Sequence, residues 1–236
     1  MMFFDCETTS TGNDGTAVDV VLAITRVDNK STVWREMPAA PLTRATAVKL
    51  ASCLVNHVGT VCTFNGAGFD FKIIAALICP GTLRTQLIAK CIHSHVDIFF
   101  DFFTSVGYFA SMESFCVACN LDGKSWSGAE SAAAAITAFS AGCEDRELIM
   151  EQIKEYCIGD TVCLEQLCAY LDANCCLRRV AKSSGKITSW TPWKIKSFRT
   201  VADCLRDWTV QPVDTSWMSP PPPSPSSLLA WVVKEP

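Results

Sequence analysis

Short apolar runs alternate with longer amphipathic runs along most of the chain. The short runs predict β-strands over residues 1–7, 17–27, 31–37 and 60–64. Apolar positions spaced by three and four predict helices over residues 44–57, 69–78, 111–119, 128–140 and 147–172. Three strands in succession, followed by helices and strands in alternation, indicate an α/β fold in which helices flank a mixed β-sheet.

Acidic residues stand at the ends of two of the predicted strands. Asp5 and Glu7 close the first strand, and their spacing of two places both carboxylates on one face of the sheet while Cys6 points to the other. Asp70 follows the strand at 60–64 and a glycine-containing turn at 65–68, so it lies at a strand–loop–helix junction. We expect these side chains to approach one another.

The longest helical pattern carries a tyrosine and a fourth acid. Tyr156 and Asp160 are four residues apart and therefore stack on one helix face. Carboxylates packed in a partly dry site repel one another unless cations hold them, and oxygen ligands favour Mg²⁺ or Mn²⁺ over zinc. Two such ions can catalyse phosphodiester hydrolysis. The pattern predicts a metal centre built from Asp5, Glu7, Asp70 and Asp160.

Three motifs, in this order, resemble those of the DEDD superfamily of 3′-to-5′ exonucleases, which have a ribonuclease H-like fold. They are Phe-Asp-Cys-Glu-Thr at 4–8, Asn-Gly-Ala-Gly-Phe-Asp at 65–70 and Tyr-Cys-Ile-Gly-Asp at 156–160. The tyrosine branch matches better, because Tyr156 precedes Asp160 by four residues and Glu155 stands where the histidine branch has His. Residues 111–124 also resemble the segment before the third motif in predicted exonucleases related to the proofreading domain of family B DNA polymerases.

The resemblance implies that residues 1–177 form a ribonuclease H-like 3′-to-5′ exonuclease domain. It implies that two divalent cations, Mg²⁺ or Mn²⁺, are held by the four carboxylates, and that Tyr156 positions the attacking water. The expected activity is hydrolysis of phosphodiester bonds at the 3′ end of DNA or RNA by a two-metal-ion mechanism. The alternative is a catalytically inactive module that keeps the fold and binds nucleic acid.

Each signal also has a structural interpretation when it is taken alone. An acid pair spaced by two arises often by chance. Asp70 can interact with the dipole of the helix that it begins, and Tyr156 can be a half-buried aromatic residue. The ordered set on strand, junction and helix favours the exonuclease-type site.

The net charge of −4 is unevenly distributed, with −9 over residues 1–177 and +5 over residues 178–236. The basic residues of the second part alternate with aromatic ones, a mixture suited to phosphate contact and base stacking on a single strand. The alternative is a loop whose tryptophans fold back onto the core. The candidate nucleic-acid-binding residues are Asn65 and Phe69 of the second motif and Arg178, Arg179, Lys182, Lys186, Trp190 and Trp193.

The extension over residues 178–236 also contains a proline-rich segment at 219–227, which we expect to be a polyproline II spacer. The apolar residues 228–233 beyond it are expected either to dock on the main domain or to bind a protein partner, and docking is favoured.

Composition agrees with a folded intracellular protein. A chain of 236 residues with 49% hydrophobic residues buries a sizeable core in one main domain. Its apolar runs are shorter than the about 18 residues of a membrane span. Asp5 and Glu7 interrupt a signal peptide at the N-terminus. We therefore expect a cytoplasmic or nuclear protein that is neither membrane-bound nor secreted.

Cysteines and histidines offer two further candidate sites. The 14 cysteines are expected to be reduced core side chains. Cys116 and Cys119 have the spacing of a zinc half-site, but no second ligand pair is evident, so packing is favoured. A strand through residues 93–97 would place His93, His95 and Asp97 on one face, in a structural role or at the rim of a substrate site.

Overall fold

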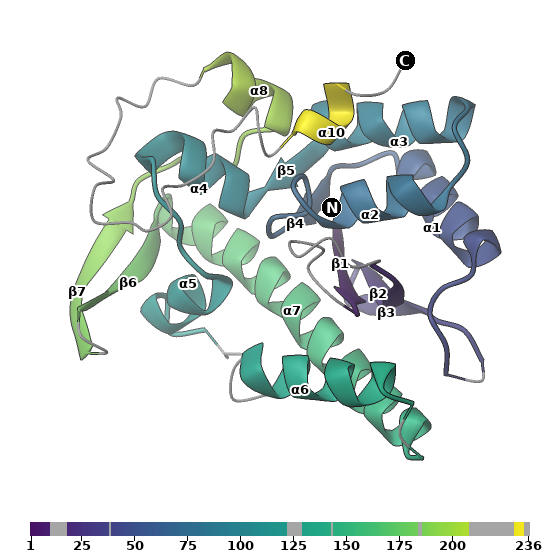
Figure 1. The fold of residues 1–236 in the computed structure, drawn as a ribbon. Helices are drawn as coiled ribbons and strands as arrows, with labels where there is room; N and C mark the ends of the chain where they lie inside the picture. The colour runs from purple at the N-terminus through teal and green to yellow at the C-terminus, as the bar shows by residue number, and fades with distance from the viewer. Residues whose placement is uncertain are drawn as a thin grey trace.

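The protein is built around a mixed β-sheet (Figure 1). The structure is a computed structural model and describes residues 1–9, 18–37, 39–121, 129–142, 144–183, 186–207 and 229–233. Within them the five-stranded sheet has the order β3-β2-β1-β4-β5. Its strands are β1 (Met2–Thr8), β2 (Val20–Val27), β3 (Lys30–Trp34), β4 (Val61–Thr63) and β5 (His95–Asp97). The predicted α/β fold with a mixed sheet is confirmed.

Strand β1 lies in the middle of this sheet. It pairs antiparallel with β2 and parallel with β4. Strands β2 and β3 form a hairpin whose turn residues Asp28 and Asn29 have φ angles of 48° and 63°. Two successive residues with positive φ match the right-handed twist of paired strands, which explains the tight connection. The central position of β1 places its two acids, which are partly buried, between the helices on the two faces of the sheet.

Helices cover both faces of the sheet (Figure 1). Helices α1 (Arg44–Asn56), α2 (Asp70–Leu77) and α3 (Thr82–His93) share a core cluster with Phe4 and Cys6 of β1. Helices α5 (Met112–Ala118) and α7 (Arg146–Asn174) share a second cluster with Phe3. Helix α6 (Ala129–Ser140) packs with α7 against β2 in a third. Alternate residues of β1 therefore face different helix layers, as the strand period requires.

Three parts of the fold were not predicted. Helix α3 has a weak apolar period, and helix α4 (Ile98–Val106) is a short run rich in phenylalanine, which its sequence alone does not distinguish from a buried strand. Part of the basic extension, for which no strand was predicted, forms an antiparallel hairpin, β6 (Leu177–Ser183) with β7 (Lys186–Trp193). The expectation that His93 and His95 share one face of a strand was wrong, because His93 ends α3 and is exposed, whereas His95 lies on β5 and is fully buried.

Residues beyond 177 complete the cores of the first part of the chain. Leu177 and Trp193 are buried in the second cluster, and helix α8 (Val201–Arg206) contributes Val201 to the first. Arg199 donates from its backbone N–H and from Nε to the buried carboxylate of Asp101, at 2.9 and 2.8 Å. The division of the chain at residue 177 stays a prediction, because the described part of the extension shares its packing with the sheet domain.

The C-terminal apolar segment docks on the first core cluster, as favoured from the sequence. Leu229 is buried there, and the short helix α10 (Ala230–Val233) packs Trp231 and Val232 beside it. The proline-rich segment 219–227, and with it the predicted spacer and protein-partner site, lies outside the described residues. In the described part of the chain, no helix combines the length and apolar character of a membrane span.

Candidate active site

Asp5 and Glu7 lie on the face of β1 that meets helix α7. Their carboxylate oxygens and the Sγ atom of Cys157, on α7, all lie within 4.8 Å of one another. The thiol of Cys157 donates to Oδ2 of Asp5 at 3.1 Å. The structure thus brings the two strand acids together as predicted and adds a thiol that the sequence reasoning did not include.

Helix α7 also carries Tyr156 and Asp160, and both are nearly buried, with 7% and 6% of their surface exposed. The negative charge of Asp160 is close enough to Asp5 to raise the pKa of that carboxyl. A helix of 29 residues packed along β1 and β2 holds both side chains on one face. The fourth acid therefore faces the strand acids, as the spacing of the third motif predicts.

Asp70 is the first residue of helix α2 and approaches β1 from the other helix layer. Its Oδ1 accepts hydrogen bonds from the backbone N–H of Cys6 at 3.1 Å and from the Cys6 thiol at 2.8 Å. Its charge still acts on Asp5, whose pKa it raises. Asp70 therefore contacts β1 at Cys6, between Asp5 and Glu7 in sequence, from the face opposite to theirs.

The loop before Asp70 is held by a buried aspartate at the end of β5. Asp97 accepts from the backbone N–H of Asn65 at 2.8 Å and from that of Ala67 at 2.9 Å. Asn65 itself has a φ of 68°. A Cβ on Gly66 would collide with the side chain of Thr63, so the turn requires glycine there. Asp97 thus fixes the loop that presents Asp70, and its signal in the sequence was an acid at the end of a short strand.

A tryptophan from the C-terminal segment holds the same loop. The indole Nε1 of Trp231 donates to the carbonyl oxygen of Ala67 at 2.9 Å. The backbone N–H of Ala67 donates to Asp97, so hydrogen bonds hold both the N–H and the carbonyl of this residue. Residues far apart in sequence therefore converge on the turn that carries Asp70, an arrangement that no local pattern indicates.

Replacing Trp231 with Phe removes this hydrogen bond and keeps an aromatic ring. Loss of one such bond costs about 1 kcal/mol, and we expect Tm to fall by about 2 to 4 °C. We also expect weaker Mn²⁺ binding, measured by calorimetry, because Asp70 is less well positioned. The control is Trp34→Phe on β3. It removes the hydrogen bond that the Trp34 indole donates to the hydroxyl of Thr25, on β2, at 3.0 Å. Equal Mn²⁺ affinities in the two variants would contradict a role for Trp231 in positioning this loop.

Mutual repulsion among Asp5, Glu7, Asp70 and Asp160 favours binding of positive charge between them. Burial raises the pKa of Asp5 well above its ordinary value of 3.8, and the charges of Asp160, Glu7 and Asp70 raise it further. Burial also raises the pKa of Asp70 to about 7, although its bonds from Cys6 act in the opposite direction. Like charges in a desolvated site stay ionised at neutral pH only when cations compensate them.

The donor set fits hard divalent cations. Mg²⁺ and Mn²⁺ take carboxylate oxygens as ligands in proteins. Four acidic side chains of this site offer such oxygens. Among the described side chains, the ligand atoms within 4.8 Å of one another belong to Asp5, Glu7 and Cys157, and Asp70 and Asp160 are not in that group. The charges of Asp70, on α2, and Asp160, on α7, nevertheless act on Asp5. The ligands that could hold the cations are Asp5, Glu7, Asp70 and Asp160.

The candidate nucleic-acid-binding residues fall into different places. Asn65 and Phe69 lie in the loop before Asp70, and Phe69 packs in part on the first core cluster. Trp193 is 6% exposed and packs against Phe102 with ring centroids 5.1 Å apart. The prediction that Trp193 stacks on bases is therefore wrong, because its ring is already buried in the core. The alternative, a tryptophan that folds back onto the core, holds for this residue.

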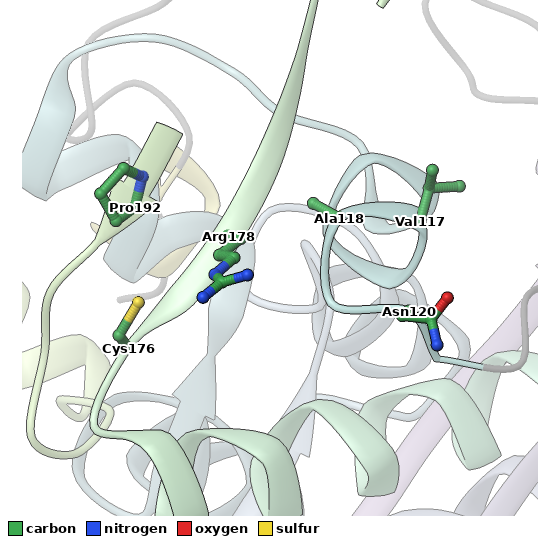
Figure 2. Close-up of a pocket in the computed structure, with 6 residues that line it drawn as sticks. All are labelled: Val117, Ala118, Asn120, Cys176, Arg178 and Pro192. Atoms are coloured by element: carbon green, nitrogen blue, oxygen red, sulfur yellow. The ribbon is translucent and has the colours of Figure 1, made fainter. Parts of the chain in front are cut away.

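Arg178 and Arg179 are the second and third residues of strand β6. Arg178 is exposed and lines a cavity of about 520 Å³ between α5 and the β6–β7 hairpin. Figure 2 shows it between Cys176 and Pro192 on one side and Asn120 on the other. Arg179 instead stacks over the ring of Tyr108 at 4.4 Å. The side chains of Lys182, Lys186 and Trp190 lie outside the described part of the structure.

The remaining cysteines and histidines form no second metal site among the described side chains. Cys116 and Cys119 are buried, and the thiol of Cys119 donates to the carbonyl of Arg178 at 3.6 Å. Both cysteines therefore pack in the core, as the favoured interpretation expected. His95 bonds to the hydroxyl of Thr63 at 2.7 Å, and burial lowers its pKa to about 3.

A family model of the RNase H superfamily matches residues 2–172. A search of curated proteins found no match to the chain. The matched range includes all five strands of the central sheet and the helices α1 to α6, and it contains Asp5, Glu7, Asp70, Tyr156 and Asp160. Because the match spans well over half of the 236 residues, the chain belongs to the RNase H superfamily.

Proposed function

We propose that the protein is a metal-dependent 3′-to-5′ exonuclease of the tyrosine branch of the DEDD superfamily. The observation that carries the proposal is that Glu7, Asp70 and Asp160 all lie close enough to Asp5 for their charges to raise its pKa. These acids come from β1, α2 and α7, and Tyr156 is on the same helix as Asp160. Superfamily membership supports phosphodiester chemistry on nucleic acid. The substrate class is the 3′ end of single-stranded DNA or RNA.

Asp5, Glu7, Asp70 and Asp160 would hold two divalent cations, Mg²⁺ or Mn²⁺. When bound, such cations supply a nucleophilic water at neutral pH and stabilise the charge on the departing 3′ oxygen. The chain's own contribution is to fix the ligands. Asp70 is held by the Cys6 backbone and thiol, and its loop is held by Asp97. The hydroxyl of Tyr156 would position the attacking water from the face of α7.

The test is a time course on single-stranded DNA and RNA labelled at the 5′ end, with Mn²⁺ or with a chelator. We expect a ladder that shortens from the 3′ end in Mn²⁺ and no products in the chelator. A single internal cut would identify an endonuclease instead. Binding without any cut, with all four acids intact, would identify a non-catalytic module. The Asp160→Asn variant controls for contaminating nuclease, because it should cut neither substrate.

Tyr156→Phe should reduce turnover only in part. The variant loses one hydrogen bond to the attacking water but keeps every cation ligand, so we expect kcat to fall roughly 10 to 10³-fold. Mn²⁺ affinity should barely change, and the rise of rate with pH should persist because the hydroxyl orients the water without acting as a base. Tyr170→Phe, on the same helix and part of the second core cluster, is the matched control. Full activity in Tyr156→Phe would assign the tyrosine to packing alone.

Arg178→Ala should weaken binding of a single strand without changing kcat. An exposed arginine that contacts phosphate contributes sequence-independent affinity, so the variant should lower the slope of log affinity against log salt by about 1. Lys49→Ala removes another exposed cation, on helix α1, and should leave the slope unchanged. Fluorescence anisotropy over a salt series measures both. Equal slopes in the two variants would exclude Arg178 from the nucleic-acid contact.

A further inference from the structure

A thiol lies where the proposed exonuclease needs only oxygen ligands. Cys157 is fully buried, and its Sγ donates to Oδ2 of Asp5 at 3.1 Å. The same sulfur lies within 4.8 Å of the carboxylate oxygens of both Asp5 and Glu7. Asp5 and Glu7 remain partly accessible, so a cation can approach the sulfur from the carboxylate side. Proposed catalysis by the four acids leaves this thiol without a chemical role.

Ligand chemistry separates two classes of cation at this position. Mg²⁺ takes oxygen ligands, whereas thiolate favours softer ions such as zinc. Zinc lies about 2.3 Å from sulfur and about 2.0 to 2.2 Å from a carboxylate oxygen, so ligand atoms at tetrahedral angles around one ion lie roughly 3.4 to 3.6 Å apart. The three ligand atoms lie within 4.8 Å of one another, so they reach that spacing by side-chain adjustments of up to about 1.4 Å.

We propose that Asp5, Glu7 and Cys157 form a mixed oxygen–sulfur site for a thiophilic divalent cation of the zinc and cadmium class. Binding forms a bond between the cation and Sγ and releases the thiol proton to solvent, with no change of oxidation state. Because the ion uses Asp5 and Glu7, it displaces Mg²⁺ or Mn²⁺ from them. The displacement rests on the proposed function, whereas the site itself rests only on the three ligands.

The test is a titration of the full chain with Cd²⁺ alone, followed by the ultraviolet charge-transfer absorbance of sulfur bound to cadmium. We compare the wild type with Cys157→Ser, which keeps a donor to Asp5. The control is Cys53→Ser. Burial alone raises the pKa of the Cys53 thiol, so no carboxylate charge acts on it. We expect Cys157→Ser alone to lose one thiolate's share of the band and to weaken the tightest Cd²⁺ binding at least about tenfold.

Affinity for Mg²⁺, measured by calorimetry, should not fall in Cys157→Ser, since the acids are intact. An unchanged cadmium band and affinity in this variant would overturn the proposal. If its thermal unfolding shows that it does not fold, Glu7→Gln replaces it: the Cd²⁺ affinity should fall while the thiolate band persists at saturation. Unchanged Cd²⁺ affinity in Glu7→Gln would overturn the proposal as well.

The outcome is separable from that of the proposed function. A protein that cuts no nucleic acid but shows a Cys157-dependent cadmium band would retain this site and lose the exonuclease assignment. A protein that shortens 3′ ends in Mn²⁺ and binds Cd²⁺ equally well in wild type and Cys157→Ser would retain the exonuclease assignment and lose this site.

Discussion

Asp5→Asn should abolish metal-dependent cleavage, with kcat lower by on the order of 10³-fold or more. Asp5 is the acid on which the charges of Glu7, Asp70 and Asp160 all act, and its oxygens lie in the ligand group with Glu7 and Cys157. An amide keeps the shape but loses the charge that binds a cation. The fold should survive, because Asn relieves repulsion among four acids.

The measurement is kcat on a labelled single strand in Mn²⁺, together with Tm in the presence of a chelator. We expect a Tm that is equal to or higher than that of the wild type. The control, Asp28→Asn, changes an exposed aspartate in the β2–β3 turn with a φ of 48°, a position that suits Asn. It should keep full activity. Near-wild-type turnover in Asp5→Asn would show that the assigned centre is wrong.

Without divalent cations, the protein should lose stability as pH rises from about 4 to about 7. Burial raises the pKa of Asp70 from its ordinary 3.8 to about 7. The folded state therefore binds more protons than the unfolded state in this window, and the free energy of unfolding falls as pH rises. A shift of this size corresponds to on the order of 4 kcal/mol. Added Mn²⁺ at neutral pH should restore the stability by replacing the protons.

Other buried groups titrate in the same window, so the test is a difference between two proteins. The pKa values of Asp5 and Asp97 are raised like that of Asp70, whereas that of His95 is lowered and acts in the opposite direction. Subtracting the pH profile of Asp70→Asn from that of the wild type isolates Asp70. We expect the variant to be the more stable protein at neutral pH in chelator.

Asp101→Asn provides the opposite case. Asp101 is also buried, but it faces the guanidinium of Arg199 at 2.7 Å. Removing its charge should lower Tm at neutral pH, because it leaves a partly buried cation without this partner. Replacement by Asn would then raise Tm at Asp70 and lower it at Asp101, although both aspartates are buried. Equal destabilisation by Asp70→Asn and Asp101→Asn at neutral pH would exclude charge repulsion as the cause.

Local patterns in the sequence were sufficient for the main elements and for the acids. The strand that carries Asp5 and Glu7, the junction at Asp70 and the helix that carries Tyr156 and Asp160 are all read from short-range periodicity and spacing. Superfamily membership confirms the fold. Helix α3 was not predicted because its apolar period is weak, and helix α4 was not predicted because a short apolar run can be either a helix or a buried strand.

The sequence by itself determined which residue types stand at each element, because strand and helix periods depend only on neighbours along the chain. Only the tertiary structure decided which groups meet across the sheet. The thiol of Cys6 bonds to Asp70 from one helix layer, and that of Cys157 bonds to Asp5 from the other. The indole of Trp231 reaches Ala67, 164 positions away in sequence. Trp193 was expected to stack on the bases of a nucleic acid, but its ring is buried in the core. Such contacts depend on packing between distant segments, which buries apolar surface regardless of sequence separation.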